Sequence, residues 1–298
     1  MIPIYIPYIN KYKKSAIKAI DENWISNYGT NVKNAEEKIK NILNIKYCIL
    51  MNNGTAATHC LFLALKYKYP QINKIYIPNN VFIAPWNCVL NEYQKNNLEV
   101  MKIDYNTLNI DTNEDYIKSF ENNSCILIVH NYGNIINVPR LNRIRPDLII
   151  IEDNCEGLFG KYENQYSGSY KNTLCSAVSF YANKTLTTGE GGMISTNNFK
   201  LYNKCKSLRN LCFGKKQRFN HDEIGWNYRI TNIQAALGLN QLKRLDFTVK
   251  RKMEIGNYYF QRLSKNKNIY MTPPNISFSK NIYWVVGIMI KNKKILAS

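Results

Sequence analysis

The chain has 298 residues, of which 45% are hydrophobic and 20% charged, and its formal net charge is +19. This length is enough for one large domain, or for one large and one small, with a core that needs no disulfides. No apolar run is long enough to cross a membrane, and the N-terminal MIPIYIPYINKYKK lacks the charge order of a secretory signal, so we expect a cytoplasmic protein that does not bind membranes.

The cysteines, the histidines and the positive charge each have an ordinary interpretation. The eight cysteines form no CxxC pair and several stand in apolar runs such as SCILIV, so we expect buried, reduced thiols. The three histidines show no metal-ligand spacing, and we expect no metal site. The lysines are scattered, and AT-rich codons account for much of their excess. A phosphate-bearing substrate is the next explanation for the charge, and nucleic acid is the last.

Short apolar runs alternate with helical stretches along the chain. The runs predict buried strands at 47–51, 74–78, 98–103, 125–130, 147–152 and 176–181. Between several of them, amphipathic stretches predict helices at 55–67, 84–93 and 113–122. This order predicts an α/β fold with a mostly parallel sheet flanked by helices on both sides. In such sheets, ligands bind beyond the carboxyl ends of the strands.

The last part of the chain predicts a second unit. Residues 231–263 form a long amphipathic helical segment, with Thr231 as a plausible N-cap. The turn-rich TPPNISFSKN and an apolar strand at 283–290 follow, and the sequence stops soon after. A single strand after a long helix does not close a domain. We therefore expect a large domain over 1–245 and the start of an incomplete small α/β domain over 246–298.

Three signals follow the predicted strands, and each is weak alone. NNGTAA (52–57) feeds a helix, where free N–H groups bind phosphate, although most such glycines only make a turn. Asp153 follows a buried strand and is either a helix N-cap or the counter-charge of a protonated ring nitrogen. Lys184 stands between an apolar strand and TTGEGG, and is either a surface charge or an amine nucleophile.

Taken together, the three signals favour one cofactor. A phosphate cradle, a buried acid and a reactive lysine on successive strand ends match the needs of pyridoxal 5'-phosphate. That cofactor requires an anchor for its aldehyde, an acid facing its pyridine nitrogen and a site for its phosphate.

Longer motifs give the chain a family resemblance. The matching segments run in family order through the chain and include WISNYG (24–29), NNGTAATHCLFLAL (52–65), IEDNCEGLFGKY (151–162), SFYANKTLTTGEGGMISTN (179–197) and GWNYRITNIQAALGLNQLKRLD (225–246). They resemble the sugar aminotransferases of the DegT/DnrJ/EryC1/StrS family. The resemblance implies the architecture of fold type I aminotransferases that use pyridoxal phosphate.

The resemblance also implies roles for the residues around the cofactor. Lys184 matches the lysine that bonds to the cofactor, and Asp153 matches the acid at its pyridine nitrogen. Glu156 stands where the family places a polar residue near the ring hydroxyl, and Phe82 matches the aromatic residue that stacks on the ring. Some relatives have His in place of the lysine and are dehydratases. The presence of Lys184 therefore favours amino transfer.

The phosphate site and the substrate entrance are implied in the same way. Gly54, Thr55 and Ser179 match the phosphate cradle. Asn227 matches a residue that reaches the phosphate from the partner subunit, which implies a homodimer with the active site at the subunit interface. His221 and Arg229, and with weaker support Trp24 and Ser26, fall in segments that line the substrate entrance. Ordinary surface or interface contacts explain His221 and Arg229 about as well.

Within the family, the chain looks most like perosamine-synthase-type enzymes. The implied reaction moves an amino group from an amino acid, expected to be glutamate, to carbon 4 of a 4-keto-6-deoxy nucleotide sugar. A UDP-linked sugar of the viosamine type is the alternative to the GDP-linked sugar. Family members usually continue well past the strand at 283–290, so a relic that binds cofactor without turnover is a second alternative. A nucleic-acid-binding protein is favoured only by the charge of +19, and the sequence shows no DNA-binding motif.

Overall fold

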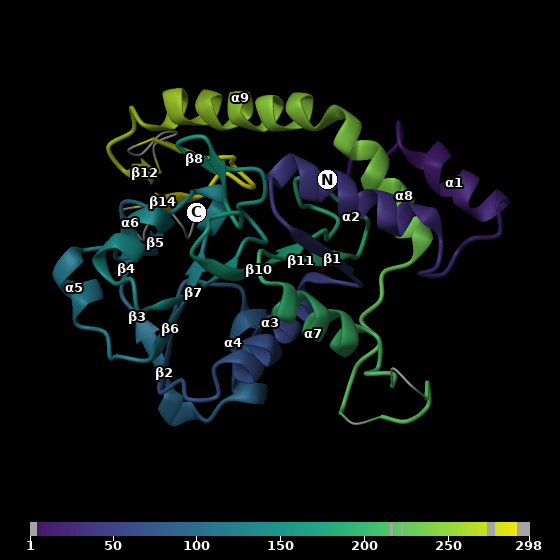
Figure 1. Cartoon of the computed structure of the whole chain (residues 1–298). Helices are drawn as coiled ribbons and strands as arrows, with labels where there is room; N and C mark the ends of the chain where they lie inside the picture. Colours follow the sequence, from purple (N-terminus) through teal and green to yellow (C-terminus); the bar gives the residue numbers. More distant parts are fainter. Residues whose placement is uncertain (1–4, 215–216, 222, 273–277, 291–298) are drawn as a thin grey trace.

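The computed structural model describes residues 5–214, 217–221, 223–272 and 278–290 of the chain. In this part of the chain, the main sheet has seven strands in the order β1-β11-β10-β7-β6-β2-β3, with helices on both faces (Figure 1). The strands are β1 (Tyr47–Met51), β2 (Lys74–Pro78), β3 (Leu98–Met101), β6 (Ser124–Val129), β7 (Ile149–Asp153), β10 (Thr173–Ser179) and β11 (Gly192–Thr196).

The sheet is mostly parallel, which confirms the expected fold class. Strands β10, β7, β6, β2 and β3 each run parallel to the next strand in the sheet. Strand β11 is the exception, because it lies antiparallel to both β1 and β10. The sequence analysis does not predict β11. Its residues GMIST continue the glycine-rich TTGEGG and resemble the end of a turn.

One face of the sheet is covered by three helices, namely α3 (Gly54–Lys68), α4 (Ile83–Glu92) and α7 (Phe199–Arg209) (Figure 1). Helix α3 begins where the Asn53 side chain accepts a hydrogen bond from the Ala56 N–H at 2.7 Å. Alternate strand residues pack under these helices, among them Ile75 of β2 and Leu127 of β6. Helix α3 is buried almost all round, which fixes its N-terminus at the sheet edge.

The opposite face carries α2 (Thr30–Leu43), α8 (Asn232–Gln241), α5 (Glu114–Lys118) and α6 (Val138–Ile144). Leu50 of β1 packs with α2, and Ile126 of β6 packs with α5 and α6. Both faces of the strands are therefore buried, which is why they read as continuous apolar runs in the sequence. The remaining short elements of the first part are α1 (Lys13–Asp21), η1 (Lys95–Asn97), η2 (Asn131–Gly133), β4 (Ile103–Asp104) and β5 (Asn109–Ile110).

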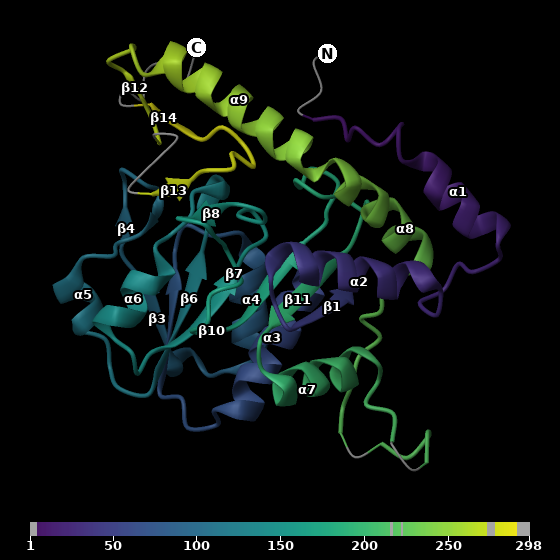
Figure 2. The same ribbon diagram turned by 45° about the horizontal axis from the view of Figure 1, so that its top comes forward.

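Helix α9 (Leu245–Leu263) crosses the molecule above the sheet and carries the chain to its last described strands (Figure 2). Strand β12 (Ile269–Met271) pairs antiparallel with β14 (Ile288–Ile290). Strand β13 (Ser279–Lys280) pairs with β8 (Lys161–Tyr162), which also pairs with β9 (Gln165–Tyr166). Through β13, the end of the chain is connected to the segment between β7 and β10.

Four predicted elements differ in detail. The helical segment 231–263 is divided by the 3₁₀ turn η3 (Leu242–Arg244) into α8 and α9, and Thr231 is its N-cap as predicted. The run 98–103 is divided between β3 and β4, and helix 113–122 ends early as α5. The strand predicted at 283–290 is wrong over its first five residues, because Tyr283 has a φ of 47° and regular pairing begins at Ile288.

The cysteines are free thiols, and all are buried except Cys155, which is half-buried. Among the described helices, none has the length and apolar character that a membrane crossing requires. The division of the chain at residue 245 stays a prediction, and residues 291–298 of the expected small domain lie outside the described part.

Candidate active site

The residues predicted to bind a cofactor, apart from Asn227, gather around one cavity. It has a volume of about 850 Å³ and lies where β6, β7 and β10 end and α3 and α4 begin. The position beyond the carboxyl ends of the strands is the one expected for this kind of sheet. The predicted residues that line the cavity are Gly54, Thr55, Phe82, Asp153, Glu156, Ser179 and Lys184.

The start of α3 forms the anion side of the cavity. Gly54 is the first residue of the helix, and a Cβ added to it would lie 2.6 Å from the Cβ of Ser179. This close approach requires glycine and brings the Ser179 hydroxyl against the helix start. The first turn of a helix has N–H groups without partners inside the helix and a partial positive charge. Together with the exposed Thr55, these groups form a suitable cradle for a phosphate.

Asp153 is the last residue of β7 and is buried, with 5% of its surface exposed. Its Oδ1 accepts a hydrogen bond from the Cys155 N–H at 3.0 Å, which holds the carboxylate at the end of the strand. The strand therefore delivers a buried negative charge to the floor of the cavity. Such a charge is costly unless a cationic group faces it.

Glu156 lies on the same side of the cavity. Burial raises the pKa of its carboxyl to about 7, and the negative charge of Asp153 also raises this pKa. The positive charge of Lys184 and a hydrogen bond from the Tyr132 N–H act in the opposite direction and lower it. The Tyr132 N–H reaches Glu156 Oε2 at 2.7 Å. Tyr132 has a φ of 57°, so the backbone adopts a left-handed conformation to make this contact. Glu156 can hold or release a proton near neutral pH.

Lys184 enters the cavity from the turn that follows β10. Its N–H donates to the Tyr181 carbonyl at 2.9 Å, which closes the turn. Phe82, the residue before α4, is 71% exposed, an unusual state for a phenylalanine side chain at a cavity. An exposed aromatic face at the cavity mouth is suited to stacking on a planar ring.

The cavity also contains residues that the sequence analysis does not identify, above all Trp284 and Asn183. The Lys184 Nζ lies 3.7 Å from the centroid of the Trp284 indole. Asn183 Oδ1 is buried and has no hydrogen-bond partner among the described residues. The sequence analysis missed Trp284 because it predicted a strand at 283–290. An apolar strand pattern does not indicate that one of its side chains contacts a lysine far away in the sequence.

The residues present fit pyridoxal phosphate. The donor set combines a primary amine, a buried carboxylate, a second carboxyl of raised pKa and an anion cradle in one cavity. The unpaired Asn183 Oδ1 provides a free acceptor at the same cavity. These groups correspond to the aldehyde, the pyridine nitrogen, the ring hydroxyl and the phosphate of that molecule.

The remaining predicted residues lie outside the cavity of the single chain. Asn227 is exposed and forms a bridge with Asn210, whose side chain accepts a hydrogen bond from Arg229 at 2.7 Å. His221 is exposed and contacts the Leu211 carbonyl at 2.8 Å. The backbone carbonyls of Trp24 and Ser26 accept hydrogen bonds from Asn232. The substrate roles of these residues and the partner role of Asn227 stay predictions.

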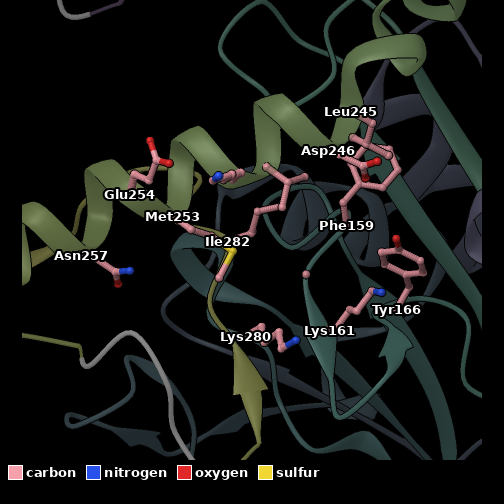
Figure 3. Close-up of a pocket in the computed structure, with 13 residues that line it drawn as sticks. Phe159, Lys161, Tyr166, Leu245, Asp246, Met253, Glu254, Asn257, Lys280 and Ile282 are labelled. Carbon is pink, nitrogen blue, oxygen red and sulfur yellow. The ribbon is translucent and has the colours of Figure 1, made fainter.

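A second cavity, of about 500 Å³, lies between α9 and the strands β8, β9 and β13 (Figure 3). Its floor is apolar and includes Phe159 and Ile282, and its rim carries Lys161, Lys280 and Glu254. None of the predicted site residues lines it. The chemistry expected from the sequence is therefore placed in the larger cavity at the strand ends.

Comparisons with known proteins identify the family of the chain. The model of the DegT/DnrJ/EryC1/StrS aminotransferase family matches residues 8–297. The chain is 30% identical over 293 residues to a GDP-perosamine synthase of Escherichia coli O157:H7, which covers 97% of the chain and 78% of that protein. It is 30% identical over 243 residues to a UDP-4-amino-4,6-dideoxy-N-acetyl-beta-L-altrosamine transaminase of Campylobacter jejuni, covering 80% of the chain and 63% of the relative.

Among solved structures, the fold is similar to that of an aminotransferase from Helicobacter pylori that is involved in the biosynthesis of pseudoaminic acid. The TM-score is 0.84 at 26% identity, over 99% of this chain and 79% of that one. The family match spans nearly the whole chain, and the similar fold and the cofactor-type cavity agree with it. The chain therefore belongs to the DegT/DnrJ/EryC1/StrS aminotransferase family and is an aminotransferase that uses pyridoxal 5'-phosphate.

Proposed function

We propose that this protein transfers an amino group from glutamate to carbon 4 of a 4-keto-6-deoxy nucleotide sugar, in the manner of a perosamine synthase. Its activity is that of a sugar aminotransferase on a nucleotide-sugar substrate. The observation that carries the proposal is the joint presence of Lys184, Asp153 and the anion cradle at one cavity. The keto position and the GDP group are supported by the similarity to the perosamine synthases.

In this proposal, the cavity residues hold the cofactor at four points. Gly54, Thr55 and Ser179 bind the phosphate, and Phe82 stacks on the ring. Asp153 faces the pyridine nitrogen, and its buried negative charge keeps a proton on that nitrogen. Glu156 contacts the ring hydroxyl.

The chemical work of the chain is proton transfer. Pyridoxal phosphate, when bound, accepts the electrons of the bond that breaks at the α-carbon of the amino donor. The Lys184 amine would take the proton from that carbon as a general base and deliver it to the C4′ carbon of the cofactor, and in the second half of the reaction it would carry out the same transfer in reverse. Asp153, at the floor of the cavity, faces the far side of the ring and balances the charge there. The partly buried position of these groups limits competing reaction with water.

The nucleotide remains open to one alternative. A nucleoside diphosphate needs positive charge and N–H donors whichever base it carries. The basic chain suits both GDP and UDP sugars, and relatives acting on each are similar to it. A UDP-linked 4-keto sugar of the viosamine type is therefore the second candidate.

The proposal includes a homodimer. Asn227, expected at the phosphate, is exposed and does not line the cavity of its own chain. Phe82, which lines the cavity, and Ile83, the next residue, are exposed apolar side chains that suit burial by a second copy. In this arrangement Asn227 of each subunit completes the site of its partner.

The proposal is tested by the visible absorbance of the purified protein with pyridoxal phosphate, before and after glutamate is added. We expect a yellow band that glutamate bleaches and that the keto-sugar substrate restores. Comparing GDP- and UDP-linked 4-keto-6-deoxy sugars as restoring substrates identifies the nucleotide. A yellow band that glutamate leaves unchanged would instead indicate a cofactor-binding protein without turnover.

Two lysine variants make this test specific. Lys184→Ala removes the amine, so the yellow band and turnover are lost while the phosphate cradle remains. Lys206→Ala, an exposed lysine of α7, serves as the matched control and retains both. A Lys184→Ala protein with full turnover would overturn the assignment.

A further inference from the structure

We propose that Trp284 and Lys252 position the reactive amine of Lys184, with the indole of Trp284 holding the amine and Lys252 holding Trp284. The inference rests on the proposed function, because it assigns Lys184 as the cofactor-bonding lysine. Both residues are far from the other cavity residues in sequence: Trp284 reaches the cavity from the segment before β14, and Lys252 reaches the Trp284 carbonyl from α9.

The contact between Trp284 and Lys184 is direct. The Lys184 Nζ lies 3.7 Å from the centroid of the indole, well within the range of about 6 Å for a cation–π interaction. Tryptophan is the aromatic side chain that attracts a cation most strongly. A lysine side chain has four rotatable carbon–carbon bonds and is otherwise free to swing. The indole face therefore selects one location for the amine within the cavity.

Trp284 is itself fixed by hydrogen bonds at three atoms. Its Nε1–H donates to the Asn183 carbonyl at 3.1 Å, and its backbone N–H donates to the Tyr132 carbonyl at 3.0 Å. Its own carbonyl accepts from the Lys252 Nζ at 3.1 Å. The first bond connects the indole to the residue next to Lys184. The second connects it to the residue whose N–H is bonded to Glu156.

Lys252 is an unusual partner for a backbone carbonyl. It is half-buried on α9, and no salt bridge is found for it among the described residues. Burial lowers the pKa of its amine, and the positive charge of Lys184 lowers it further, which indicates that the two amines lie near each other. Keeping a partly desolvated amine without a carboxylate is costly. A positioning role for Lys252 explains why the fold retains it.

The other charged groups around Lys184 do not by themselves fix the position of its amine. Asp153 and Glu156 face the cavity from the end of β7 and the turn after it, and their negative charges attract the amine from the cofactor side. Lys252 and the Trp284 indole belong to other parts of the chain: Lys252 lies on α9, and Trp284 lies in the segment before β14. With the indole in place, the amine is held between these groups at the position where it must meet an aldehyde carbon.

The test compares two forms of the cofactor. When pyridoxal phosphate is captured, the lysine nitrogen replaces the aldehyde oxygen, which leaves as water, and this step needs a positioned amine. Pyridoxamine phosphate has no aldehyde and binds without the lysine. In Trp284→Leu we expect the rate of formation of the yellow band to fall about fivefold, which corresponds to the loss of about 1 kcal/mol typical of a cation–π contact. The affinity for pyridoxamine phosphate, measured by fluorescence titration, is expected to stay unchanged.

Conservative variants and controls separate positioning from folding. Trp284→Phe keeps an aromatic face and is expected to restore part of the capture rate. Lys252→Met should slow capture, whereas Lys252→Arg, which keeps a donor, should restore it. The controls are Trp86→Phe, a tryptophan outside the cavity, and Lys250→Met, an exposed lysine of α9. A further measurement needs no cofactor: the protein is acetylated, and the labelling of Lys184 is measured by mass spectrometry. Among the tryptophan variants, only Trp284→Leu should show altered labelling of Lys184.

Each outcome has a distinct meaning. Equal capture rates in the wild-type protein and Trp284→Leu would overturn the inference and leave the proposed function intact. Equal losses for the two cofactor forms would also overturn it, because they indicate a structural role for the indole. A wild-type protein that forms no yellow band would contradict the proposed function itself.

Discussion

At the residue scale, the proposed chemistry depends on the carboxylate of Asp153 at the end of a strand. The carboxylate is buried at the end of β7, and its hydrogen bond from the Cys155 N–H is one that an amide oxygen can also accept. Asp153→Asn therefore keeps the shape and loses only the charge. We expect the fold to survive and turnover to fall by about 10²–10³-fold, the usual effect of removing a preorganised electrostatic group.

This prediction is checked by single-turnover kinetics with glutamate, alongside circular dichroism of the variant. Asp147→Asn is a suitable control, since Asp147 is a surface carboxylate that pairs with Arg145. A near-normal rate in Asp153→Asn would rule out the proposed role for the carboxylate.

Glu156 makes the stability of the cofactor-free protein depend on pH. Its pKa is about 7 in the folded protein and about 4.5 in the unfolded chain. The folded state therefore binds more protons between these values, and stability falls as the pH rises from about 4.5 to about 7. Glu156→Gln removes this loss. The change that it makes in the free energy of unfolding should therefore be more stabilising above pH 7 than at low pH, by up to about 3 kcal/mol.

Urea unfolding of both proteins at about pH 5 and about pH 8 measures the difference. The exposed Glu163→Gln provides the comparison for loss of a surface charge. Parallel pH profiles for the wild-type protein and Glu156→Gln would contradict the prediction.

The sequence predicted the residues that follow a strand directly and missed those that arrive from elsewhere. Lys184 and Asp153 were predictable because a buried strand marks its own end. Trp284 was not, since it is 101 residues from Asn183, to which its indole is bonded, and its segment resembles a strand. No local pattern predicts such a contact, because it depends on how α9 lies across the molecule.

At the scale of elements, Thr231 is a helix start that the sequence identified. Its side chain accepts the Gln234 N–H, and Gln234 reaches back to the Thr231 N–H at 3.0 Å, so the two form a capping box. Thr231→Ala removes one of these bonds and should lower the free energy of unfolding by about 1 kcal/mol.

Thermal or urea unfolding checks this value against Thr248→Ala. Thr248 lies inside helix α9, where alanine is the better helix former, and its hydroxyl donates to the carbonyl of Arg244, the residue before the helix. We expect little or no loss there. A Thr231→Ala protein as stable as Thr248→Ala would mean that tertiary packing alone holds the start of α8.

Most strands of the main sheet could be predicted, because strands that are buried on both faces appear in the sequence as continuous apolar runs. Strand β11 could not, because Gly192 and the polar Ser195 and Thr196 give it no such run. Its place is determined by its partners: a Cβ at Gly192 would lie 2.5 Å from the Asn53 carbonyl oxygen. The division of 231–263 also escaped the periodicity, since a single 3₁₀ turn scarcely disturbs an amphipathic pattern.

At the scale of the whole molecule, the proposed dimer leads to a mixing experiment. If Asn227 serves the partner's cavity, Lys184→Ala and Asn227→Ala damage different parts of each shared site. A mixed dimer then holds one intact site and one with both defects. Random exchange of subunits should restore about a quarter of wild-type turnover from two nearly inactive variants.

Turnover is measured before and after the two variants are unfolded together and refolded. Each variant refolded alone serves as the control. A mixture no more active than its components would mean that Asn227 and Lys184 serve the same subunit, or that Asn227 has no role at the phosphate.

The position of β11 also affects how the protein is made. Among the described strands, β1 pairs with β11 alone, and Cys48 of β1 and Met193 of β11 are 145 residues apart in sequence. At a translation rate of ~5–20 residues per second, β1 leaves the ribosome about 7–30 s before its partner exists. During that time, the apolar strand β1, which leads into the proposed phosphate cradle at Gly54, has no strand to pair with. A nascent chain of this protein therefore needs shielding, by a chaperone or by α2, until the glycine-rich segment after Lys184 is synthesised.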